Sequence, residues 1–291
     1  MSERELAEAQ RLIEAALRED LDTAGDLTSN AVIPESLQSK AIVVIRQAGV
    51  VAGLPLIELI AEKFRPPVEV QLLQADGLAA QGTQAARLAG SMRSILGIER
   101  VMLNLVGRLS GVATMTRQYV DAIAGTKAKI FDTRKTTPGF RYLEKYAVRV
   151  GGGRNHRIGL FDQVLIKDNH LAAIALESKD PVRDAIYRAR ENSPPGTVVE
   201  IEVDNPEQLK VAIQHGPDII LLDNMNNTEL ATAVSLRDRT APKIELEASG
   251  GVNLKTVRAI AETGVDRISV GALTHSAPCL DVALDHEAPT P

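Results

Sequence analysis

The sequence predicts an α/β protein, in which an α/β sandwich precedes either a β/α barrel or an open, doubly wound parallel sheet. From about residue 129, short β-branched runs alternate with amphipathic helical stretches, a pattern typical of β-α units around a parallel sheet. The strand centres Ile201, Ile220, Leu246 and Ile268 lie 19, 26 and 22 residues apart, which is the pitch of such units. The first 125 residues lack this alternation and form a different domain.

The N-terminal part begins with an amphipathic helix over about residues 3–20. Two strand-rich segments punctuated by glycine follow, at 40–53 and 68–82, with a helix between them over 54–64. A long helical region is then expected over 86–125. We place the domain boundary so that residues 1–115 form the sandwich and 116–274 the barrel, with the tail 275–291 packing on the first domain.

In the second part each strand is a short apolar run, and the later strands are separated by helices. Asparagines are expected to cap three of these helices, at Asn205, Asn227 and Asn253, and glycines end two of them, at Gly216 and Gly264. A further helix carries Arg141, Lys145 and Arg149. The predicted strands are Lys129–Asp132, Val164–Lys167, Val198–Val203, Ile219–Leu222, Ile244–Ala248 and Ile268–Val270.

Composition excludes several classes of protein. The mean hydropathy is −0.04 and no apolar run approaches the ~18 residues of a membrane span, so we expect no membrane partner. Aromatic residues make up 3% of the chain, tryptophan is absent and the net charge is −5, which argues against nucleic-acid binding. The acid-rich N-terminus is unlike a targeting peptide, and one cysteine permits no internal disulfide, so a cytoplasmic location is expected.

One stretch of this acidic chain is strongly basic. Between Arg134 and Lys167 the sequence holds eight lysines and arginines against two acids. Arginine forks suit carboxylates and phosphates, lysines act as movable point charges, and glycines at 151–153 let the backbone approach a ligand. The stretch predicts an anion-binding site, against the alternative of a solvated charged face.

Polar groups also follow the apolar run of every predicted strand. The carboxyl ends of parallel strands meet at one edge of the sheet, so these groups should converge on one cavity. They are Asp132–Lys135, Lys167–His170, Glu202, Asp223–Asn224, Ser249–Gly251 and Gly271–Ala272.

Two carboxylates, Glu202 and Asp223, stand beside this basic site. Strand alternation puts Glu200 on the same face as Glu202. Such a pair indicates Mg²⁺ held together with substrate phosphates, or hydrogen bonds to sugar hydroxyls. The alternative is an ion-pair network inside the barrel.

The glycine-rich turns at 249–251 and 270–273 predict a phosphate site, because backbone amides at such turns and at helix N-termini bind phosphate. His156 lies between Arg154 and Arg157, where it could contact a carboxylate or serve as a structural loop residue. The spacing of the histidines and Cys279 predicts no zinc site. No nucleophile-elbow or dinucleotide motif is found in the sequence.

In series, the segments TRKTTPGFRYLEKYAVRVGGGRNHRIGL, LIKDNH, EIEVDN, LLDNM, EASGGV and ISVGALTHS closely resemble the quinolinate phosphoribosyltransferase family. The N-terminal AALREDLDTAGDLTS and GIERVMLNLVGRLSGVAT also look like that family, so the resemblance covers essentially the whole chain.

The resemblance implies a type II phosphoribosyltransferase fold, with an N-terminal α/β sandwich and an incomplete C-terminal β/α barrel. It implies that quinolinate and phosphoribosyl pyrophosphate give nicotinate mononucleotide, pyrophosphate and CO2 with Mg²⁺, in NAD biosynthesis. It also implies a homodimer with a shared active site, and leaves a larger assembly open.

The resemblance further implies roles for individual residues. Arg134, His156 and Arg157 would contact the carboxylates of quinolinate, with Thr133 and Lys167 close by and Arg100 supplied by the partner subunit. Lys135 and Lys167 would neutralise the pyrophosphate. Glu202 and Asp223 would hold ribose hydroxyls and Mg²⁺. The 5′-phosphate would be bound by Ser249, Gly250, Gly251, Val270, Gly271 and Ala272.

Two other functions stay open at this point. One is a phosphoribosyltransferase of the same fold that uses nicotinate or another aromatic anion, because pocket shape is not visible in a sequence. The other is a non-catalytic anion-binding regulator, against which the presence of both the carboxylates and the lysines argues.

Overall fold

A computed structural model describes residues 1–287 and divides the chain into two compact units. The first unit contains Met1–Arg117, Thr136–Gly152 and the chain from Leu273 onward, and the second contains Gln118–Lys135 and Gly153–Ala272. The division of the sequence at residues 115 and 116, and the packing of the tail on the first domain, stay predictions. Residues 288–291 of that tail lie outside the described part.

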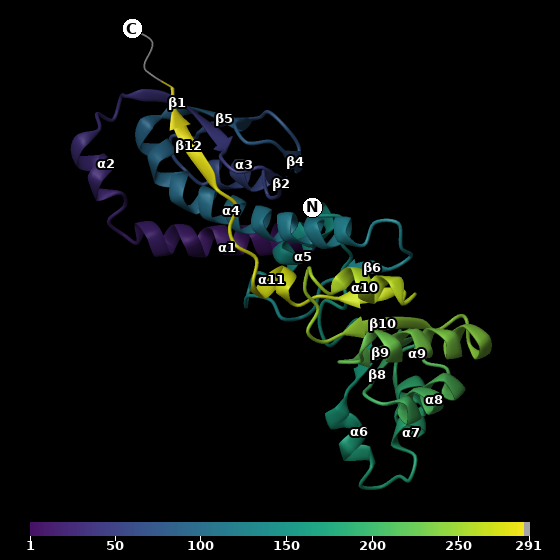
Figure 1. Cartoon of the computed structure of the whole chain (residues 1–291). Helices are drawn as coiled ribbons and strands as arrows, with labels where there is room; N and C mark the ends of the chain where they lie inside the picture. The colour runs from purple at the N-terminus through teal and green to yellow at the C-terminus, as the bar shows by residue number, and fades with distance from the viewer. Residues whose placement is uncertain (288–291) are drawn as a thin grey trace. The chain divides into compact units, whose positions relative to one another are not determined.

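The first unit is built on an antiparallel sheet in which the chain's last strand lies beside its first (Figure 1). The sheet order is β12 (Val282–His286), β1 (Gln38–Ile45), β5 (Thr83–Ser91) and β3 (Glu69–Leu72), and β2 (Gly49–Val51) pairs separately with β4 (Gly77–Ala79). The helices are α1 (Glu3–Leu21), α2 (Leu27–Val32), α3 (Pro55–Ala61), α4 (Met92–Ala122) and α5 (Arg141–Val150).

The helix expected over 86–125 is wrong at its beginning, because residues up to Ser91 belong to β5. Alanine and leucine favour a helix in isolation, but β5 pairs with both β1 and β3. Ala86 and Leu88 are buried, whereas Arg87 is partly exposed. Pairing in the sheet therefore outweighs the local helix propensity.

The second unit is built on a parallel sheet that confirms each predicted strand to within a residue or two. Its order is β6 (Lys129–Phe131), β11 (Arg267–Ser269), β10 (Glu245–Ser249), β9 (Ile219–Asp223), β8 (Val199–Val203) and β7 (Val164–Ile166). The first strand of this unit, β6, thus pairs with its last strand, β11. Within the described residues, β6 and β7 stand at the two edges of the sheet. This open ring of parallel strands is the expected incomplete barrel.

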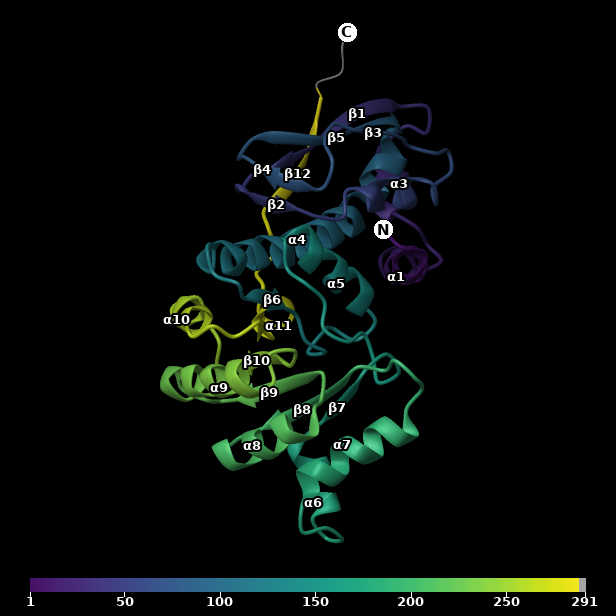
Figure 2. The same ribbon diagram turned by 90° about the vertical axis from the view of Figure 1, so that its right-hand side faces the viewer.

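Helices α7 (Pro181–Asn192), α8 (Pro206–His215) and α9 (Asn227–Thr240) lie along the sheet of the second unit (Figure 2). Each packs on the next, and α7 and α8 also contact β8. Two shorter helices, α6 (Asp168–Ile174) and α10 (Val257–Glu262), follow β7 and β10, and α11 (Ala272–His275) follows β11. None of the helices in the described residues combines the length and the apolar character that crossing a bilayer requires.

The predicted helix caps are right in one case and displaced in two. The side chain of Asn205 accepts from Gln208 N, and Gly216 ends α8 in the left-handed conformation, as expected. The cap of α9 is Asn226 rather than Asn227. Asn253 instead forms a turn in which its side chain accepts from Lys255 N, so α10 begins only at Val257.

Candidate active site

The parallel register brings the predicted site residues of the second unit to one edge of the sheet. Ser249 on β10 lies beside Asp223 on β9, and Val203, next to Glu202 on β8, lies beside Leu222. Residues 132–135 and 167–170 directly follow β6 and β7 at the same edge. The sequence prediction that polar strand ends converge agrees with this geometry.

Glu202 and Asp223 line one cavity of about 350 Å³ between the strand ends and α6. Lys167 Nζ lies 2.9 Å from Glu202 Oε2, and Asn224 Nδ2 donates to Asp223 Oδ2 at 2.6 Å. Both carboxylates are partly exposed, so each can accept a further partner from a ligand. Two accessible carboxylates, joined by the phosphate oxygens of a bound substrate, would form a set of ligands that suits Mg²⁺.

Asp132 holds the loop that carries His156 and Arg157. This aspartate is fully buried after β6, and its Oδ1 accepts from His156 N at 2.8 Å. Its Oδ2 accepts from Asn155 Nδ2 at 2.6 Å, and Arg154 forms a parallel bridge with Phe131. The loop at 154–157 is therefore fastened along the edge strand, close to Thr133–Lys135.

Arg134 and Arg157 bring two positive charges together. Burial, followed by the neighbouring Arg134 guanidinium, lowers the pKa of Arg157. Arg157 is partly buried, and its Nη1 donates to Gln163 O at 3.4 Å. Two guanidinium groups in mutual repulsion favour an anion between them.

The turn after β6 continues with Lys135, which is exposed. Its backbone N–H donates to Thr133 Oγ1 at 3.0 Å. This hydrogen bond closes a short turn around Arg134, directly after β6.

The interior of the second unit holds a network of ionisable side chains that the sequence predicted only in part. His156 Nε2 lies 3.0 Å from Glu200 Oε2 and 3.5 Å from Glu247 Oε1. Arg267 Nε donates to Glu247 Oε2 at 2.6 Å, and its guanidinium lies 3.8 Å from the centre of the Phe131 ring. Glu200 thus belongs to an ion-pair network inside the barrel, while Glu202 faces the cavity.

Sequence reasoning missed Glu247 and Arg267. The signal was present, because IELEA and DRISV each place a charged residue within a run of otherwise buried strand residues. Among the described residues, His156, Glu200 and Glu247 form a buried group of three side chains that could each offer a ligand atom to a metal ion. Arg267 supplies a positive partner to Glu247 and the histidine Nε2 a hydrogen-bond donor to Glu200, so the group is explained without a metal.

Burial and the charge of Glu200 raise the pKa of Glu247. Burial lowers the pKa of His156, but the hydrogen bond to Glu200 and the negative charges of Glu247 and Glu200 raise it by more. The net shift of this pKa is therefore upward. A backbone N–H also donates to His156 Nδ1, from Arg157 at 2.8 Å. A proton on Nδ1 would oppose that N–H, so the hydrogen bond at Nδ1 acts against the upward pKa shift, and we take the geometry to favour the neutral ring with its proton on Nε2.

The glycine turn after β10 is shaped for a close backbone approach. Gly250 and Gly251 have φ of 94° and 61°, and a side-chain carbon at Gly250 would lie 2.1 Å from Asn224 Oδ1. Only glycine fits there. The expected helix start near Asn253 is wrong, so the turn itself, and not a helix N-terminus, presents the amides of Ser249–Gly251. Val270, Gly271 and Ala272 follow β11 at the same edge of the sheet.

The remaining predicted residues lie in the first unit. Arg100 is exposed on α4. Of the basic residues on α5, Arg149 is exposed and pairs with Glu5 at 2.5 Å, whereas Lys145 is buried.

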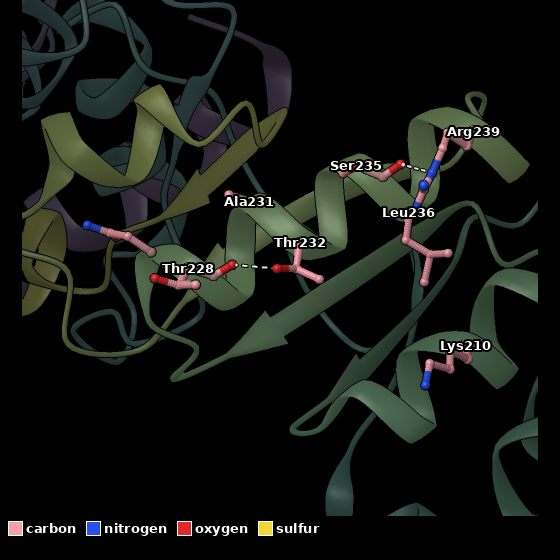
Figure 3. A pocket seen from close by; sticks show the side chains of 8 residues that line it. Lys210, Thr228, Ala231, Thr232, Ser235, Leu236 and Arg239 are labelled. Atoms are coloured by element: carbon pink, nitrogen blue, oxygen red, sulfur yellow. Dashed lines mark hydrogen bonds between the residues drawn. The ribbon is translucent and has the colours of Figure 1, made fainter.

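A second hollow, of about 700 Å³, lies on the outer surface of α8 and α9 (Figure 3). Thr232 and Arg239 there donate to main-chain oxygens of Thr228 and Ser235 within α9. In the part of the chain that the structure describes, its lining includes none of the predicted site residues. We therefore place the active site at the strand ends.

Comparison with known proteins shows the family to which the chain belongs. Residues 26–110 match the model described as quinolinate phosphoribosyl transferase, N-terminal domain, and residues 112–285 match the corresponding C-terminal domain. The chain is 44% identical over 288 residues to nicotinate-nucleotide pyrophosphorylase (carboxylating) of Mycobacterium leprae, which covers 98% of this chain and 99% of that protein. It is 41% identical over 277 residues to the probable enzyme of the same name from Bacillus subtilis, covering 95% and 92%. The structure of nicotinate-nucleotide pyrophosphorylase from Francisella tularensis superposes with a TM-score of 0.90 at 37% identity, covering 97% of this chain and 96% of that one. The chain therefore belongs to the quinolinate phosphoribosyltransferase family.

Proposed function

We propose that the chain catalyses the reaction of its family, transferring the phosphoribosyl group of phosphoribosyl pyrophosphate to quinolinate with decarboxylation. The products are nicotinate mononucleotide, pyrophosphate and CO2, which places the step in NAD biosynthesis. The observation that carries this proposal is the proximity of Arg134 and Arg157, the first directly after β6 and the second on the loop that Asp132 fastens. Quinolinate is a dicarboxylate, and two adjacent guanidinium groups complement it better than they complement a monocarboxylate.

The quinolinate half of the site would consist of Arg134 and Arg157, with Thr133 and Lys167 at its border. Arg100 would come from the partner subunit of a homodimer. This arrangement would surround the aromatic acid with cations, and the loop fastened by Asp132 would hold one of them, Arg157, in place before the substrate arrives.

The phosphoribosyl pyrophosphate half would use the cavity of Glu202 and Asp223. Their carboxylates would hold the ribose hydroxyls and Mg²⁺, which when bound neutralises negative charge on the pyrophosphate. Lys135 and Lys167 would contribute two further positive charges. The amides of 249–251 and 270–272 would bind the 5′-phosphate.

The chemistry then follows from charge. As pyrophosphate leaves, the ribose carbon becomes positive, and a nearby carboxylate stabilises it while the pyridine nitrogen attacks. The lysines hold the departing negative charge. When CO2 then leaves the adjacent carbon, the positive ring nitrogen stabilises the electron pair that stays on that carbon, and the carbon takes up a proton from solvent water. This sequence needs neither a covalent enzyme intermediate nor a general base.

The substrate is tested by measuring pyrophosphate release with quinolinate and, separately, with nicotinate. We expect turnover with quinolinate only, because nicotinate lacks the second carboxylate. Activity with nicotinate alone would overturn the proposal in favour of the related enzyme.

Catalysis, as opposed to anion binding, is tested by Lys135→Ala and Glu202→Ala. Lys135 is exposed and Glu202 is partly exposed, so both variants should fold, yet each should lose turnover by about two orders of magnitude or more. Near-native rates in both variants would exclude the proposed roles. Removal of Mg²⁺ by a chelator should abolish turnover, and re-addition should restore it.

We also propose that the enzyme is a cytoplasmic homodimer with a shared active site. If Arg100 acts across the interface, mixing inactive Arg100→Ala and Lys135→Ala subunits should restore part of the activity, because one of the two sites in a mixed dimer is then intact. Failure to recover activity despite demonstrated subunit exchange would rule out the shared site.

A further inference from the structure

The His156 ring is enclosed by protein partners on both of its nitrogens. Nδ1 accepts the backbone N–H of Arg157 at 2.8 Å, and Nε2 lies 3.0 Å from Glu200 Oε2. A nitrogen that accepts an N–H carries no proton, so the one ring proton lies on Nε2 and is donated to Glu200. The side chain is only 6% exposed.

The partners behind the ring are themselves fixed. Glu200 is fully buried, and its Oε2 also accepts from Gln163 Nε2 at 2.6 Å. Glu247, on the other side of the ring, is held by Arg267 at 2.6 Å. The ring is therefore fastened to the inside of the sheet.

Arg157 is held at the opposite end of the same ring. Its backbone N–H donates to the ring, while its guanidinium contacts Gln163 O at 3.4 Å and lies in the field of Arg134. The interior network thus reaches Arg157 through His156. In the proposed quinolinate site, Arg157 and not the histidine would carry the charge toward the anion.

We propose that His156 is a positioning residue: it fixes the backbone of Arg157 through Nδ1 and does not contact quinolinate. This inference rests on the proposed function and changes the direct contact that resemblance to the family implied for His156. The specificity of the site for an aromatic dicarboxylate would depend on a buried histidine whose two nitrogens both bond to the protein.

Two substitutions separate positioning from contact. In His156→Asn the side-chain oxygen can occupy the place of Nδ1 and still accept the Arg157 N–H, but it cannot replace Nε2. In His156→Gln the amide reaches the place of Nε2 but leaves the Arg157 N–H without its acceptor. If His156 contacts quinolinate through Nε2, the glutamine variant should bind quinolinate better than the asparagine variant. If His156 positions Arg157 through Nδ1, the asparagine variant should bind quinolinate better.

We expect His156→Asn to keep the KM for quinolinate within about threefold of wild type and His156→Gln to raise it about tenfold or more, the loss expected for one hydrogen bond. The KM for phosphoribosyl pyrophosphate should stay unchanged in both variants. Thermal unfolding confirms that each variant is folded at the assay temperature. The reverse order, equal losses or no loss would overturn the proposal.

A measurement on the wild-type protein needs no folded variant at this position. The chain has five histidines, so ¹⁵N signals of His156 can be assigned by replacing the others. We expect the neutral Nε2–H pattern with and without quinolinate, and an imidazolium pattern on addition of quinolinate would overturn the proposal. A wild-type protein without activity on quinolinate would refute the proposed function instead, so the two failures are distinguishable.

Discussion

Lys167→Met separates a role in catalysis from a role in stability. Lys167 Nζ lies 2.9 Å from Glu202 Oε2, and the two side chains are 47% and 14% exposed. An ion pair with one partner half in water contributes about 0–1 kcal/mol to stability. The free energy of unfolding should therefore fall by no more than about 1 kcal/mol.

The expected effect on the reaction is much larger. If the ammonium faces the departing pyrophosphate, its removal should lower kcat/KM by about 10²- to 10³-fold, or roughly 3–4 kcal/mol of transition-state stabilisation. Because Glu202 loses its cation at the same time, its contact with the ribose also changes. Activity should thus fall far more than stability.

The assay compares nicotinate mononucleotide formation and urea unfolding in wild type, Lys167→Met and the control Lys63→Met. Lys63 Nζ lies 2.7 Å from Glu14 Oε1 on the surface of the first unit, so the control removes a similar ion pair outside the site. The control should keep wild-type kcat/KM. If Lys167→Met stays within about threefold of the control, the assignment of Lys167 to the reaction is refuted.

Two further predictions concern buried charges. Arg267→Met should reduce the free energy of unfolding by about 3–5 kcal/mol, because it leaves the fully buried Glu247 without its cation; a loss below about 1 kcal/mol in urea unfolding would contradict this. Burial alone would raise the pKa of Asp266, but hydrogen bonds, chiefly from Arg237, lower that pKa on balance. The contribution of Asp266 to stability is therefore complete above the unfolded pKa of about 3.9, and it is lost as the pH falls through the lower pKa of the folded state. The stability difference between wild type and Asp266→Asn should therefore be largest near neutral pH and shrink below about pH 4, and a constant difference across that range would show that the charge of Asp266 is not responsible.

The sequence predicted the second unit better than the first, for a physical reason. In β9 the run IILL is buried throughout, and in β8 the buried Val199, Ile201 and Val203 alternate with two glutamates, so the pattern of apolar residues alone marks each strand. β5 carries alanines and an arginine that also suit a helix, and only its pairing with β1 and β3 decides the matter. Such pairing joins residues far apart in the chain and leaves no local signal.

The candidate site shows the same division. Arg134, Lys167 and Asp223 could be predicted as site residues from their positions at the ends of predicted strands, because the carboxyl ends of parallel strands lie at one edge of the sheet. Arg267 and Glu247 escaped it, since a charged residue in a strand is informative only when its buried partner is known. The caps of α9 and α10 were displaced because neighbouring asparagines offer equivalent side chains, and the exact start depends on packing.

The bonds that Asp132 makes to residues 155 and 156 have a consequence for binding entropy. A cationic loop without a ligand tends to spread apart under its own repulsion, and a substrate must then order it at a cost of about 0.5–1.5 kcal/mol for each immobilised side chain. Here a buried carboxylate fastens the loop from within the protein, so part of that ordering is complete when the chain folds. Binding energy that would otherwise assemble the loop is left for the substrate's reacting atoms.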